Sequence, residues 1–95
     1  MMLSVIDASY LGDYKIALMF NDKNTGIANL HDVIFDDNRV PFSELRDENE
    51  FKKFKIEHDT LVWESGLDLA PEFLFFVAFK KSPEFQNQFK AWGYQ

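Results

Sequence analysis

Two histidine–aspartate pairs carry the residue types in this chain that metal and acid–base chemistry needs. His31 precedes Asp32 and His58 precedes Asp59, so each pair could offer a ring nitrogen and a carboxylate to a zinc ion. Three further carboxylates could complete such a site after folding: Asp36, Asp37 and Asp68. However, no two of these ligands have a spacing that recurs in metal proteins, and both pairs fall at expected turns or strand ends. The sequence therefore predicts no metal site.

An active site assembled from His58, Asp59 and Asp68 is the enzymatic alternative, with nuclease-like or acid–base chemistry. No serine lies in a Gly-x-Ser-x-Gly elbow, and the chain has no cysteine for a thiolate nucleophile, a thiolate metal site or a disulfide. Its four glycines are far apart, which excludes a phosphate-binding loop and a dinucleotide fingerprint. We therefore assign no catalytic residue and no cofactor from the sequence.

The composition is that of a small, acidic, folded domain. Apolar residues make up 46% of the 95 residues and charged residues 27%, a balance that separates the chain from disordered proteins. The net charge of −6 repels a phosphate backbone and an anionic membrane, so direct nucleic-acid binding and membrane binding are disfavoured. The sequence has no signal peptide and no apolar run long enough to span a membrane, and we expect a cytoplasmic protein.

Aromatic residues are unusually frequent, at 17% of the chain with 11 phenylalanines. A domain of this size has difficulty burying so many rings, and aromatic side chains are enriched at protein interfaces. Lys52, Lys53 and Lys55 interleave with two of the phenylalanines, a pattern that single-stranded nucleic acid favours, but glutamates flank this segment. We therefore expect some of the rings to contact a protein partner.

The elements that position these side chains begin with an antiparallel meander. Residues 14–20 alternate between apolar core positions and outer positions, which predicts a strand. A turn at residues 11–13 connects it to a preceding strand. A turn over residues 21–26 leads to a third strand at residues 27–30. Residues 31–39 read either as a fourth strand or as an irregular connection. Ser43 is a plausible N-cap for one or two short helical turns.

The second half of the chain predicts a hairpin and two helices. Strands at residues 55–58 and 60–64 flank a turn, and Ser65 and Gly66 end the hairpin. Pro71 is suited to the first position of a helix that continues to residue 81, with Asp68 as an outside cap. The apolar run 73–79 leaves a buried strand as the alternative. Residues 82–95 predict a short amphipathic helix.

Residues 42–45, Phe51 and residues 62–74 together resemble the bacterial family named domain of unknown function 2442. The shared pattern is a tryptophan, Trp63, followed in order by Gly66, Asp68, Pro71 and a leucine. The resemblance implies a small α+β domain without assigned catalytic residues, followed in some relatives by a helix-turn-helix DNA-binding domain. The tail after residue 81 is too short for such a domain, so a regulatory role would require a separate DNA-binding chain.

The predicted fold is therefore α+β, with a small antiparallel sheet of about four to five strands formed by the meander and the later hairpin. Short helices pack on one face of this sheet, and the main helix starts at Pro71. We expect one domain over residues 1–95, with a core at 1–81 and the terminal helix at 82–95. Four residues are predicted to have structural roles: Trp63, Gly66, Asp68 and Pro71. Trp63 is expected to be buried against the helix after Pro71.

The predicted function is that of a non-enzymatic protein-interaction or regulatory module. The alternatives are a small ligand-binding domain and the small enzyme described above. A helix that is apolar on all sides needs cover on more than one face, which favours a protein partner or a homodimer. The candidate interface consists of aromatic residues of the last two helices: Phe73, Phe76, Phe79, Phe85, Phe89 and Trp92.

Overall fold

The N-terminal strands form a three-stranded antiparallel meander in the computed structural model, which describes residues 2–94. Its strands lie in the order β1 (Val5–Gly12), β2 (Lys15–Phe20) and β3 (Thr25–Asn29). Asp13 and Tyr14 both have positive φ, as a two-residue hairpin turn requires. The alternation predicted for β2 is confirmed, because Ile16, Leu18 and Phe20 are buried.

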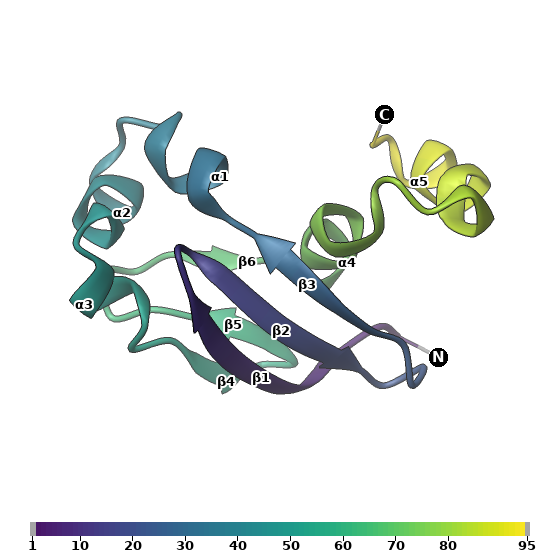
Figure 1. Ribbon diagram of the computed structural model, residues 1–95, viewed down its shortest axis with the longest axis horizontal. Helices are drawn as coiled ribbons and strands as arrows, with labels where there is room; N and C mark the ends of the chain where they lie inside the picture. The colour runs from purple at the N-terminus through teal and green to yellow at the C-terminus, as the bar shows by residue number, and fades with distance from the viewer. Residues whose placement is uncertain (1, 95) are drawn as a thin grey trace.

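A second three-stranded sheet lies behind the first in the view of Figure 1. It contains β4 (Lys55–Glu57), β5 (Thr60–Val62) and β6 (Asp68–Leu69), and the backbone N–H of Val5 joins the sheets by donating to Asp59 O at 2.8 Å. The α+β class is confirmed, with the strands divided between two sheets. Within the second sheet, a turn at Gly66, with φ of 97°, reverses the chain so that β6 pairs with β5.

Four short helices connect the two sheets at one end of the molecule (Figure 1). They are α1 (His31–Phe35), α2 (Val40–Ser43), the 3-10 helix η1 (Glu44–Arg46) and α3 (Glu48–Phe51). Both readings of residues 31–39, as a strand or as an irregular connection, are wrong, because α1 turns Ile34 into the core. Ser43 stands at the N-cap position of η1, as predicted, but its side chain makes no capping hydrogen bond and donates to Val40 O instead. Asp47 caps α3 by accepting from the N–H of Asn49 at 3.0 Å.

Two further helices close the other end of the molecule (Figure 1). They are α4 (Pro71–Phe79) and α5 (Gln86–Trp92), with the 3-10 helix η2 (Pro83–Phe85) between them. Pro71 occupies the first turn of α4, so the helical reading of this apolar run is confirmed. The cap predicted at Asp68 is wrong. Asp68 belongs to β6 opposite Val62, and Ala70 stands at the N-cap without a side-chain hydrogen bond.

The core fills the space between the sheets and continues beneath α4 and α5. Phe75 of α4 joins the two regions, since its ring centroid lies 5.0 Å from that of Phe20 and 6.2 Å from that of Phe89. Trp63 and Phe51 extend the core toward the opposite end, under α3. The helices at both ends are therefore attached to one continuous apolar interior.

Gly26 lets α4 approach β3 closely. Gly26 pairs with the buried Leu18, and a Cβ atom at Gly26 would lie 2.8 Å from two atoms of the Phe79 ring. We expect Gly26→Val to lower the free energy of unfolding by about 1 to 3 kcal/mol, because the ring and the helix must move. Urea denaturation measures this cost. Thr25→Val on the exposed side of the strand should change the free energy of unfolding by less than about 0.5 kcal/mol. An equal loss of stability in both variants would contradict a close contact between Gly26 and the Phe79 ring.

Candidate functional site

The fold separates the histidine and the carboxylates of the enzymatic alternative. His58 and Asp59 form the exposed turn between β4 and β5, whereas Asp68 pairs with Val62 at the other end of β5. Val62, the partner of Asp68, stands three residues after Asp59, which is about 10 Å at the rise of an extended chain. These residues do not share a site.

The other histidine pair remains on the surface of α1. His31 Nδ1 lies 3.0 Å from a carboxylate oxygen of Asp32, and the histidine ring packs against Phe35 with a centroid distance of 4.4 Å. Within residues 2–94 no three histidine or carboxylate side chains are grouped as metal ligands. The arrangement of these two side chains is that of a surface hydrogen bond.

Trp63 is buried, as predicted, but its neighbours differ from the prediction. Its ring stacks on Phe51 at 5.7 Å and meets Phe54 edge-on, and its indole N–H donates to Phe51 O at 2.7 Å. The expectation that it packs on the helix after Pro71 is wrong. Because β6 runs back along β5, α4 starts at the opposite end of β5 from Trp63.

Most aromatic residues of the candidate interface pack against one another between α4 and the segment that contains η2 and α5. Phe89 is 1% exposed, and its ring lies 5.1 Å from that of Phe76. Phe85 and Trp92 contact Phe75 at centroid distances of 4.9 and 6.0 Å. The stripe on α5 therefore covers α4, and Phe89 does not face outward. Phe73 is the member of the set that lines the groove described next.

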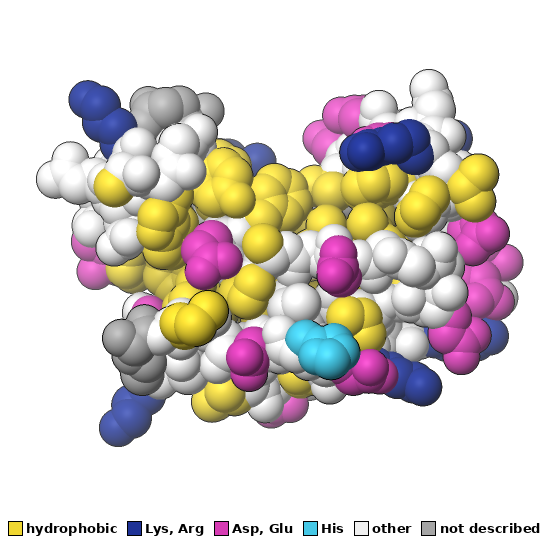
Figure 2. Space-filling model, turned by 180° about the vertical axis from the view of Figure 1, so that it is seen from behind, with side chains coloured by type: hydrophobic (Ala, Val, Ile, Leu, Met, Phe, Trp, Pro, Cys, Tyr) yellow, Lys and Arg dark blue, Asp and Glu magenta, His cyan; other side chains and the backbone are white. Residues whose placement is uncertain are grey.

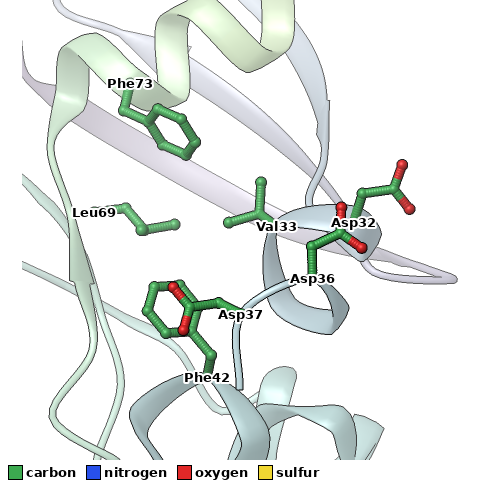
Figure 3. Close-up of a pocket in the computed structure, with 7 residues that line it drawn as sticks. All are labelled: Asp32, Val33, Asp36, Asp37, Phe42, Leu69 and Phe73. Carbon is green, nitrogen blue, oxygen red and sulfur yellow. The ribbon is translucent and has the colours of Figure 1, made fainter. Parts of the chain in front are cut away.

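An open groove lies between the α1–α2 end of the molecule and α4 (Figure 3). Its volume is about 530 Å³, and it is lined by Asp32, Val33, Asp36, Asp37, Phe42, Leu69 and Phe73. Val33, Leu69 and Phe73 converge on the floor from α1, β6 and α4, while the Asp32 side chain points away from them. Figure 2 shows the molecule from the side opposite to Figure 1, where hydrophobic side chains run between its two ends.

Three hydrogen bonds from the side chains of Arg46 and Ser65 hold the segments around this groove. Arg46 Nη2 donates to Phe35 O and Asp37 O, each at 3.1 Å, and so fixes the loop between α1 and α2. Ser65 Oγ donates to Pro41 O at 2.9 Å, which attaches α2 to the turn between β5 and β6. These hydrogen bonds fix the backbone around the groove.

One rim of the groove is charged. The Arg39 guanidinium donates from Nε to Asp37 Oδ1 at 2.9 Å and lies 5.2 Å from the centroid of the Phe42 ring. The hydrogen bond from the Arg39 side chain is the main cause that lowers the pKa of Asp37 from 3.8 to about 2. Asp32 and Asp36 lie on the same rim without a lysine or arginine within ion-pair distance among residues 2–94.

The Asp37–Arg39 pair gives a pH-dependent prediction. Because the folded-state pKa lies below the ordinary value, the pair stabilises the folded chain above about pH 4, and this contribution is lost as the pH falls toward 2. Arg39→Gln should move the Asp37 pKa up toward 3.8. An NMR titration of the Asp37 carboxyl carbon measures it. Lys23→Gln removes the same charge elsewhere and should leave the midpoint unchanged, and an unchanged midpoint in Arg39→Gln would refute the assigned cause.

The groove was not predicted from the sequence. Its floor residues Val33 and Leu69 stand far apart in the chain, and nothing in their types distinguishes them from core residues. The available signal was the pair of aspartates that starts at Asp36, directly after an apolar triplet, a pair that could also supply metal ligands. Folding instead places these carboxylates beside an exposed apolar surface.

Comparison with known proteins identifies a family. The family model described as "Protein of unknown function (DUF2442)" matches residues 5–88. No curated protein and no solved structure gives a significant match. Within residues 2–94, none of the helices has the length and apolar character needed to cross a membrane.

Proposed function

This chain belongs to the DUF2442 family of proteins of unknown function, and we propose that it is a non-enzymatic protein-interaction module. The groove between α1, α2, β6 and α4 is its binding site. The observation that carries the proposal is the apolar floor of the groove, where Val33 and Phe73 remain partly accessible beside the buried Leu69. Such a surface is favoured when a partner covers it.

The shape of the groove supports a chain segment as its ligand. Its volume of about 530 Å³ lies in the range of small-molecule sites, which supports ligand binding as the second candidate. Small-molecule sites, however, enclose most of the ligand surface, whereas this groove is open along its length. An open groove with converging apolar side chains suits a helix or extended segment that anchors one side chain.

The separation of His58 and Asp59 from Asp68 supports a role without catalysis. The carboxylates at the groove, Asp36 and Asp37, have no histidine or nucleophile directed at them within the lining of the groove. The groove thus offers a partner an apolar surface and charged carboxylates. A regulatory role through a separate chain is compatible with this mode of action.

A second copy of the chain is the alternative partner. The apolar surface of α4 that favoured a homodimer is covered by α5 on one side and by β3 at Gly26 on another. This cover weakens the argument for a homodimer through the last two helices. Light scattering at micromolar concentration distinguishes the alternatives, since a monomer leaves the groove free for a different protein.

Site-specific crosslinking tests the proposed function. A photoreactive phenylalanine analogue is placed at Val33 in the groove or, as a control, at Ile56, which is 40% exposed on β4. Irradiation in the native host should give a protein adduct from position 33 and none from position 56. The partner, once purified, should bind the Val33→Asn variant at least about tenfold more weakly than wild type, as expected for a lost apolar contact of about 1.4 kcal/mol. Equal adducts at both positions, or equal binding, would overturn the proposal.

A further inference from the structure

We propose that the partner enters the groove with a basic segment, in which lysine or arginine side chains flank one bulky apolar side chain. This inference rests on the proposed function, because it names the chemistry of the partner for the same groove. It combines two features that lie side by side in Figure 3: an apolar floor and an acidic rim.

The floor selects the apolar anchor. Val33, Leu69 and Phe73 approach one another from three elements, and none of them carries a hydrogen-bonding side chain. A polar side chain placed here would lose water without gaining a partner, whereas a leucine or an aromatic ring would not. The floor therefore favours a bulky apolar side chain.

The rim selects the charge of the flanking residues. Residues 31–39 contain three aspartates and one arginine, a local balance of −2, and the whole chain has a net charge of −6. Arg39 is engaged with Asp37, and Arg46 with the loop carbonyls, while in the described chain Asp32 contacts only the His31 ring and Asp36 has no ion-pair partner. The Asp32 side chain is 87% exposed. A cationic segment is attracted by this field, and an anionic one is repelled.

Arg39 provides an example, within this chain, of a cation bound at the rim. Its guanidinium lies over the Phe42 ring at 5.2 Å and simultaneously donates to the Asp37 carboxylate. A cation can therefore be accommodated at this rim between an aromatic face and a carboxylate, the combination that binds cations well in proteins. Asp32 and Asp36 offer the same kind of acceptor to a cation of the partner.

Three fluorescein-labelled synthetic peptides test the inference against the full chain. The first has one tryptophan flanked on both sides by lysines, the second has the same tryptophan flanked by glutamates, and the third has the lysines with glycine in place of tryptophan. Fluorescence anisotropy is recorded at low and at high salt. We expect the first peptide to bind more tightly than the other two, and its affinity to fall as salt screens the rim.

Two double variants that remove the same number of charges test whether the peptide binds at the rim. Asp32→Asn with Asp36→Asn removes two charges at the groove, and Glu57→Gln with Asp59→Asn removes two charges from the exposed β4–β5 hairpin. The first variant should bind the lysine–tryptophan peptide about fivefold more weakly or worse, and the second should bind it like wild type. Thermal unfolding of each variant checks that the fold is retained.

The outcomes separate this inference from the proposed function. If both tryptophan peptides bind alike and Val33→Asn weakens both, the groove remains a docking site and the basic segment is overturned. If the lysine peptide without tryptophan binds as tightly as the first, the apolar anchor is overturned. Failure of the first peptide to bind wild type also overturns the inference, while the crosslink from position 33 independently decides the proposed function.

Discussion

Replacing Trp63 with alanine is expected to lower the free energy of unfolding by about 3 to 5 kcal/mol. The indole is 6% exposed and stacks on Phe51, so its removal leaves a cavity between α3 and the second sheet. Its N–H also satisfies Phe51 O at 2.7 Å, and the loss of this bond leaves a buried carbonyl without its donor. Both effects act in the same direction.

Trp63→Phe separates the two contributions. Phenylalanine keeps most of the ring contact with Phe51 and Phe54 but has no donor, so we expect a smaller loss than for alanine. Urea denaturation followed by far-ultraviolet circular dichroism measures both variants. An unchanged midpoint in Trp63→Ala, or tryptophan emission typical of water for Trp63 in a Trp92→Phe background, would contradict the buried position.

Replacing Phe75 with alanine is the second substitution with a large expected effect, again about 3 to 5 kcal/mol. Phe75 is 3% exposed and connects β2 to the last helices, with centroid distances of 5.0 Å to Phe20 and 4.9 Å to Phe85. Removal of this ring therefore weakens the core and the attachment of α5 together. We expect the tail beyond residue 81 to become accessible before the rest of the chain unfolds.

Limited proteolysis under native conditions measures that accessibility. In Phe75→Ala, cleavage between α4 and α5 should precede global unfolding, whereas wild type should resist it. Phe85→Ala is the matched control, because Phe85 is half-buried at the edge of the same cluster and its removal should cost less. Equal stability losses for the two variants would refute a central role for Phe75.

Elements with strong local signals were predicted well from the sequence. In β2, buried apolar residues alternate with outer residues. Pro71 suits the first turn of a helix, whereas proline is disfavoured in the interior of a sheet. His58 and Asp59 form the predicted turn of the later hairpin, where both adopt positive φ. In each case residues within about one turn or one strand determine the local backbone conformation.

Predictions that depended on distant neighbours were less successful. The short helix α1 has little local signal, and its conformation depends on the burial of Ile34 and on the bonds that Arg46 makes to the following loop. Trp63 was correctly expected to be buried, but its partner Phe51 could not be identified, because the choice depended on the path of the chain after Gly66.

The sequence by itself determined the α+β class, the meander, the later hairpin and the two terminal helices, because periodicity and turn chemistry act over a few neighbouring residues. Only the tertiary structure decided which apolar side chains stay accessible. Val33 and Phe89 are both apolar residues of short helices, yet α5 packs Phe89 against Phe76, whereas Val33 stays partly accessible in the groove. The exposure of a side chain depends on the elements packed over it, and these come from distant parts of the chain.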